Sequence, residues 1–211
     1  MKKFFKNDWV RSISVLLIIA VVLSGLLAIL NDVLLVAPEV RTMRAIKKIY
    51  GQEMAYVTVI DVDNEDDTLP ESVRQPVEYD EGKINKIYEV GDKTSGQYEL
   101  LFQTTGFNGY KGGTVTVWVQ VTVNNGVYSI SKVLYQGNEK QTLMSKFGNE
   151  FYSKFELTDV TEAYKQGKSF SPTDGDNVIA NPVTGATKSA TAGNNAVNCV
   201  LNYLGGLTNE N

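Results

Sequence analysis

Three hydroxyl-bearing residues and a glycine lie close together near the end of the sequence, in the run NPVTGATKSA from Asn181 to Ala190. The hydroxyl groups of Thr184, Thr187 and Ser189 can each donate a hydrogen bond to a phosphate oxygen. Gly185 permits a close approach of the backbone to a ligand. A helix is predicted directly after this cluster, and the N-terminus of a helix favours an anion. Two interpretations stay open, a phosphate cradle or a well-capped helix, because Ser and Thr are also favoured N-caps.

The helix that would position this cluster is indicated by apolar residues at three- and four-residue spacing after Ser189. The dipeptide Gly205-Gly206 follows and predicts its C-terminal end. We therefore expect an amphipathic helix. Its Cys199 is the single cysteine of the chain, which excludes an internal disulfide and a cysteine metal cluster. We expect it to be a small apolar residue on the helix.

A second pattern lies at the N-terminus, where basic residues up to Arg11 precede an uncharged apolar run from Ile13 to Leu30. As a helix this run would be about 27 Å long, close to the ~30 Å hydrocarbon core of a bilayer. No small-residue cleavage site follows closely, so an uncleaved signal anchor is favoured. The prediction is a basic cytoplasmic N-terminus over 1–11, a single transmembrane helix over 12–31, and a C-terminal domain outside the cytoplasm.

The segment that follows connects this anchor to the body of the protein. Helical spacing of apolar residues from Pro38 to Tyr50, with Gly51 as a stop, predicts an amphipathic helix. We expect it to form a connecting segment over 32–52. The folded body would then occupy 53–211.

The body contains several stretches that alternate between apolar and polar residues with a period of two, which is typical of strands. Asn124-Asn125-Gly126 separates the last two and predicts a tight antiparallel hairpin. The predicted fold class is therefore α+β, with a mainly antiparallel sheet and flanking helices. The predicted strands are Ala55–Asp61, Lys83–Val90, Gln97–Thr105, Thr114–Val123 and Val127–Tyr135.

Three further segments of the body change this pattern. The glycine-rich run GFNGYKGG, from Gly106 to Gly113, is either a mobile turn or a lip that approaches a flat ligand closely. From Thr142 onward, apolar residues including Phe147, Phe151 and Phe155 mark one face of a predicted helix. A loop rich in Gly, Ser, Pro and Asp is expected from Gln166 to Asn177.

Composition removes several classes of function. A net charge of −4 argues against binding of nucleic acid, which demands clustered positive charge. The chain has no histidine, which removes the commonest general base and the commonest metal ligand. There is no G-x-S-x-G elbow, and no pair of carboxylates stands out from surface charge, so hydrolysis finds little support. We predict no catalytic side chain and no metal site, and any chemistry would come from a cofactor.

The motif resembles a known one. TGATKS is similar to the S/T-G-A-T-x-T/S flavinylation motif of membrane-anchored FMN-binding domains, as in the FMN-carrying subunits of the Rnf electron-transport complex and of the sodium-pumping NADH:quinone reductase. In that family a flavin transferase joins FMN to the final hydroxyl through a phosphoester. The resemblance implies covalent FMN on Ser189, with Thr184, Gly185, Ala186 and Thr187 as the phosphate-binding turn. Lys188 would offset the phosphate charge or face solvent.

The resemblance covers most of the chain. The N-terminal anchor, the glycine-rich run before a hairpin, the helix after GNEKQTL and the C-terminal helix containing NNAVN all fall where the family has them. The sequence departs from the pattern at Asn181, where the family commonly has an acidic residue, and at Ser189, where Thr is more usual. It also has GNEKQTLMSKF in place of an ETPGLG-like run.

The function implied is that of a flavoprotein electron carrier whose FMN-binding domain spans 53–211. It would relay electrons within an Rnf-like membrane complex, as an electron-transfer subunit and not a stand-alone enzyme. Its expected partners are the other membrane subunits and a flavin transferase. Phe107, Tyr110 and Trp118 are candidates to pack on the flavin ring. The alternative is a membrane-anchored interaction or structural module without a cofactor.

Overall fold

A computed structural model describes residues 8–34, 38–51, 57–60 and 77–208. By its internal contacts the chain divides into two compact units, Met1–Glu53 and Met54–Asn211. The acidic segment 61–76 and the ends of the first predicted strand lie outside the described residues.

The first unit contains two helices, α1 (Asp8–Leu34) and α2 (Pro38–Tyr50). The bounds of α2 agree with the prediction, and Gly51 follows with a φ of 73°. Among the described residues no helix combines the length and apolar character needed to cross a membrane, so the predicted transmembrane helix over 12–31 is wrong.

The second unit is built on an antiparallel sheet with the strand order β1-β3-β4-β5-β6, and the short β2 also pairs with β3. This confirms the α+β class and the antiparallel pairing. Asn125 and Gly126, at φ values of 50° and 83°, form the hairpin turn between the last two strands as predicted. The strands are β1 (Val57–Ile60), β2 (Glu78–Tyr79), β3 (Gly82–Val90), β4 (Gln97–Gly106), β5 (Thr114–Asn124) and β6 (Val127–Glu139).

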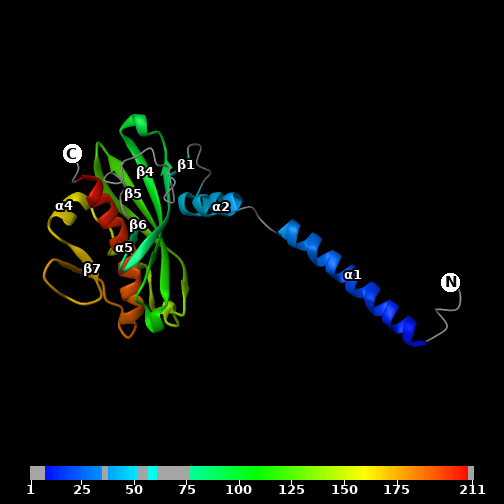
Figure 1. The fold of residues 1–211 in the computed structure, drawn as a ribbon. Coiled ribbons are helices and arrows are strands. Elements are labelled where there is room, and N and C mark those ends of the chain that lie inside the picture. Colours follow the sequence, from blue (N-terminus) through cyan, green and yellow to red (C-terminus); the bar gives the residue numbers. More distant parts are fainter. Residues whose placement is uncertain (1–7, 35–37, 52–56, 61–76, 209–211) are drawn as a thin grey trace. The chain divides into compact units, whose positions relative to one another are not determined.

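One face of this sheet is covered by the C-terminal helix α5 (Thr187–Thr208), as Figure 1 shows. Val117, Val119 and Val121 alternate along β5 and form the core together with small residues of α5. The contact is close enough that a Cβ on Gly106 would lie 1.9 Å from the Ala192 carbonyl oxygen. Only glycine fits at this position, because that distance is below any van der Waals contact.

The helix α5 differs from its prediction in two ways. It begins at Thr187 and continues past Gly205-Gly206 to Thr208, so the predicted glycine stop is wrong. It is also not amphipathic along its middle, because every side chain from Ala192 to Leu201 is buried. Asn198 shows how a polar residue is accommodated there: its amide donates to the Phe170 carbonyl at 2.9 Å and accepts from the Phe170 amide at 2.8 Å.

The segment between β6 and α5 is more broken than predicted. The single helix expected after Thr142 is interrupted at Gly148, giving a 3-10 turn η5 (Met144–Lys146) and a short helix α3 (Asn149–Ser153). The expected loop after Gln166 contains a strand. Three elements complete the segment: α4 (Val160–Lys165), and the parallel pair β7 (Ser169–Ser171) and β8 (Val178–Ala180).

Candidate functional site

The hydroxyl cluster spans the start of α5: Thr184 lies on the turn before the helix, whereas Thr187 and Ser189, predicted to precede the helix, lie in its first turn. Strand β8 leads into Asn181, and the Ala186 amide then donates to the Val183 carbonyl at 2.9 Å to close the turn. Gly185 has a φ of 70°, a left-handed conformation that favours glycine. The helix begins two residues later, so its first N–H groups and its positive dipole end lie beside the turn.

The six predicted site residues differ sharply in exposure. Thr184, Gly185, Thr187 and Lys188 are exposed. Ala186 is 5% exposed and packs in the core. Ser189, the expected FMN acceptor, is only 2% exposed. The turn therefore presents two threonine hydroxyls to solvent and keeps the serine hydroxyl inside the protein.

The buried hydroxyl of Ser189 is held by Gln141, a residue that the sequence did not single out. Its Oγ donates to Gln141 Oε1 at 2.7 Å. The same oxygen accepts from the Tyr110 amide at 3.0 Å, while Gln141 Nε2 donates to the Glu139 and Tyr110 carbonyls at 2.9 and 3.3 Å. Gln141 thus ties the start of α5 to the glycine-rich run.

Two glycines of that run lie against backbone as well as against this amide. A Cβ on Gly109 would lie 2.6 Å from both Gln141 Nε2 and the Gly113 carbonyl oxygen, and a Cβ on Gly113 would lie 2.2 Å from the Glu139 carbonyl oxygen and 2.4 Å from Gln141 Nε2. The close approach of the glycine-rich run is therefore made to the protein itself. The run forms a 3-10 turn, η4 (Tyr110–Gly112), which Gln141 contacts through the Tyr110 backbone.

The three aromatic candidates lie in different places. Trp118 points away from α5, because its neighbours on β5 face the helix, and its ring lies 6.0 Å from that of Tyr88. Phe107 is half-buried, and its carbonyl accepts from Asn195 at 3.1 Å. Tyr110 is 42% exposed and shares the partner Gln141 with Ser189. Of the three, Tyr110 is the one connected to the motif through a common partner.

Asn181, which stands where the resembling family commonly has an acid, is fully buried. Its amide donates to the Phe151 carbonyl at 3.0 Å, and its own carbonyl accepts from Asn194 at 3.3 Å. A carboxylate could not make the first bond, since it has no hydrogen to donate. Asn181 is therefore a structural tie between α3, the turn and α5.

A cavity of about 630 Å³ opens beside the turn, between Pro182–Thr184 and α3. Its lining combines Phe151 and Pro182 with the basic side chains of Lys146 and Lys154 and the acidic side chain of Glu150. Lys146 Nζ lies 3.5 Å from the Thr184 carbonyl oxygen. Because Lys146 is 38 positions away in sequence from Thr184, no spacing rule could have placed it at this site.

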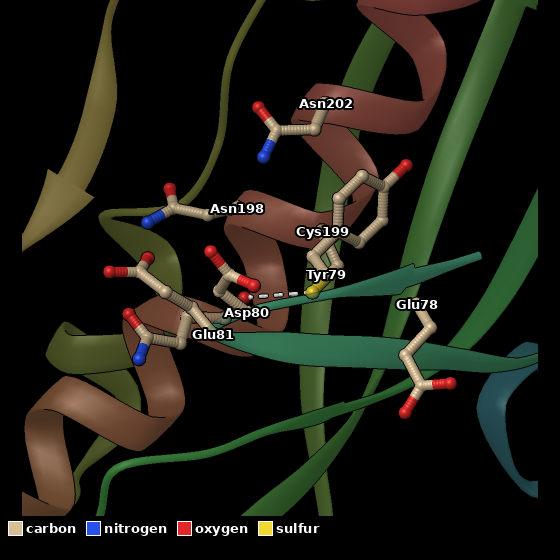
Figure 2. A pocket seen from close by; sticks show the side chains of 8 residues that line it. Glu78, Tyr79, Asp80, Glu81, Asn198, Cys199 and Asn202 are labelled. Carbon is tan, nitrogen blue, oxygen red and sulfur yellow. Dashed lines mark hydrogen bonds between the residues drawn. The ribbon is translucent and has the colours of Figure 1, made fainter. Parts of the chain in front are cut away.

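A second cavity, of about 420 Å³, lies between the acidic turn Glu78–Glu81 and one face of α5 (Figure 2). The thiol of Cys199 lies at its base, 1% exposed, and donates to the Asn195 carbonyl at 3.3 Å. Burial, with a smaller contribution from the Glu81 carboxylate, raises the pKa of this thiol to about 12. Within the described part of the chain, no group of Cys, Asp and Glu side chains is arranged to hold a metal ion.

Comparisons of the chain with protein-family models, with curated proteins and with solved structures found no match.

Proposed function

We propose that the chain is an electron-carrying flavoprotein, with FMN attached through a phosphoester to a hydroxyl of the turn that precedes α5. The observation that carries the proposal is the turn itself: exposed threonine hydroxyls and a left-handed glycine at the N-terminus of a 22-residue helix. A helix N-terminus stabilises an anion. The similarity of TGATKS to the flavinylation motif gives this anion a chemical identity.

In the family that the motif resembles, the final hydroxyl, here Ser189, accepts FMN, but the exposure of the hydroxyls in this chain favours Thr187 as the attachment point. A transferase must bring a phosphorus atom within bonding distance of the accepting oxygen, so that oxygen has to be reachable. Ser189 is 2% exposed and its hydroxyl is bonded to Gln141. Thr187 is exposed, and it is the first residue of α5, where the helix dipole favours the negative phosphoester.

The residues around the turn fit the group that would be attached. A Cβ on Gly185 would lie 2.9 Å from Lys146 Nζ, so the lysine amine lies beside the backbone of the turn, where it could meet a phosphate. The cavity beside Thr184 adds the basic Lys154 and the acidic Glu150, with Pro182 and Phe151 as its apolar part. FMN, when bound, supplies the oxidation and reduction chemistry. The protein contributes the covalent tether, the position and the electrostatic environment.

Attachment of FMN to the hydroxyl would be a phosphoryl transfer. The Thr187 oxygen forms a bond to phosphorus and its hydroxyl proton is released. The bond that breaks joins that phosphorus to the leaving group of an activated FMN donor, a phosphoanhydride supplied by a flavin transferase. The protein would then exchange electrons with the other subunits of a membrane redox complex.

The test is in-gel flavin fluorescence and intact mass after denaturation, for protein co-expressed with a flavin transferase and exported. Wild type and Ser189→Ala should fluoresce and gain the mass of one FMN less water. Thr187→Ala should not, and Thr187→Ser should, because it keeps a hydroxyl at the same place.

Two results would change the proposal. Loss of label in Ser189→Ala but not in Thr187→Ala would return the attachment to Ser189, and loss only in Thr184→Ala would move it to Thr184. An unlabelled wild type, under conditions that label a protein with the established motif, would reject the flavoprotein. An interaction module without cofactor would then be the better description.

A further inference from the structure

The phosphoester proposed on Thr187 would carry a negative charge, and the turn offers it backbone N–H groups but no cation of its own in a fixed position. Lys188 is the only basic residue of the motif, and it is exposed on the first turn of α5. A positive charge there opposes the helix dipole. A cation from another element would complete the site better.

Lys146 is placed to be that cation. It ends the 3-10 turn η5, and its Nζ lies 3.5 Å from the Thr184 carbonyl oxygen. The amine lies directly over Gly185, at 2.9 Å from the position that a Cβ would take. The glycine adopts a φ of 70°, which a side chain would strain, and the lysine amine lies against this part of the turn.

The charge of Lys146 is also available. Within the described residues no carboxylate lies at ion-pair distance from Lys146, whereas Lys154 on the same cavity pairs with Glu150 at 3.7 Å. The hydrogen-bond partner of Lys146 is a neutral carbonyl. An anion would therefore stabilise Lys146 more than it would stabilise a lysine that already pairs with a carboxylate.

We infer that Lys146 is the cationic partner of the phosphoester on Thr187 and directs the flavin toward the cavity between the turn and α3. This rests on the proposed function. It assigns to a residue outside the motif the charge compensation that the sequence suggested for Lys188. Lys146 acts as a positioning residue, since it takes no part in electron transfer.

The direct test is acetylation of lysine amines, read by peptide mass spectrometry, on FMN-loaded wild type and on unlabelled Thr187→Ala. Lys146 should react about two- to fivefold more slowly in the loaded protein, the factor that one exposed ion pair supplies. Lys132, exposed on β6, is the internal reference and should react equally in both. Equal reactivity of Lys146 in the two proteins overturns the inference.

A second measurement uses the initial rate of flavinylation at limiting transferase. Lys146→Gln should slow labelling about two- to fivefold at low ionic strength, and added salt should reduce the difference. Lys146→Arg should recover most of the rate, because it keeps the charge. Lys132→Gln is the matched control for loss of one positive charge.

The outcomes separate the two proposals. A labelled wild type with unaffected Lys146→Gln retains the flavoprotein and rejects the role of Lys146. A rate loss in Lys188→Gln but not in Lys146→Gln returns the charge compensation to the motif lysine. An unlabelled wild type rejects both.

Discussion

The first turn of α5 and the middle of the same helix are neighbours in sequence but have opposite environments. Thr187 and Lys188 are exposed, whereas the helix is buried on every side from Ala192 to Leu201. The middle packs closely against backbone, as at Gly106, where a Cβ would overlap the Ala192 carbonyl oxygen. The difference teaches that one helix can pack in the core along its middle and still present exposed side chains at its N-terminus.

The largest expected effect is on the reactivity of Cys199, in the buried middle of α5. Because burial raises the pKa of Cys199 to about 12, its reaction with iodoacetamide at pH 9 should be at least about a hundredfold slower than that of an unfolded thiol. Unfolding in urea should restore the rate. A native rate within about threefold of the unfolded one would show that this part of α5 opens readily.

The raised pKa of Cys199 also predicts that the protein loses stability at high pH. The pKa of Cys199 in the folded protein is raised above its value in the unfolded chain. The free energy it contributes is therefore fully present below about pH 8.5 and is lost as the pH rises toward the folded value. Cys199→Ala should reduce this alkaline loss in urea titrations, and an unchanged pH dependence would contradict the assignment.

The next effect tests the close contact between helix and sheet. Gly106→Ala should destabilise the protein by about 3 kcal/mol, because its Cβ would overlap the backbone of α5. Gly137→Ala is the matched control, since no atom lies within 4 Å of its Cβ position, and it should change stability by no more than about 0.5 kcal/mol. Urea denaturation measures both. Equal stability of the two variants would disprove the tight contact.

The sequence predicted those elements of the fold whose residue pattern depends only on neighbours in the chain. Strands β3 to β6 followed from period-two alternation, because a sheet buried on one face imposes that pattern. The break at Gly148 and the all-round burial of α5 could not be predicted, since the Asn residues of α5 look like a solvent face until their partners are known. Asn198 is an example: both of its bonds go to Phe170.

The candidate site also depends on contacts between residues that are far apart in sequence. The turn before α5 was predicted from residue types alone, but the exposure of each hydroxyl was not. Ser189 faces inward because Gln141 bonds to it from 48 positions away. Lys146 likewise reaches the turn only through the fold. Side chains that meet across such separations leave no trace in local spacing.

A smaller effect is expected at the boundary between the two regions of α5. Gln141→Ala removes the partner of the buried Ser189 hydroxyl and of the Tyr110 amide. The cost should be about 2 kcal/mol in urea denaturation. Gln136→Ala, an exposed amide on β6, should cost no more than about 0.5 kcal/mol. A Gln141 variant as stable as the Gln136 variant would mean that water replaces the buried bonds.

The smallest effect concerns the turn itself. Gly185→Ala forces a Cβ into the left-handed region and should cost about 1 kcal/mol. Gly112→Ala is matched to it, with a φ of 68° and no atom within 4 Å of its Cβ position, and should cost the same. Flavinylation should fall only in Gly185→Ala, because only this Cβ displaces Lys146. Equal labelling of the two variants would argue against a cradle at Gly185.

The position of α5 at the end of the described chain has a consequence for the order in which the protein is made. Strands β3 to β6 leave the ribosome first, and each pairs with its neighbour in sequence, so the sheet can assemble from local contacts. Its valine face stays exposed to water until α5 arrives. The docking of α5 then buries that face and brings Ser189 to Gln141 in one event. The core and the turn before α5 are therefore completed together, and any group carried by that turn would be attached only after α5 has docked on the sheet.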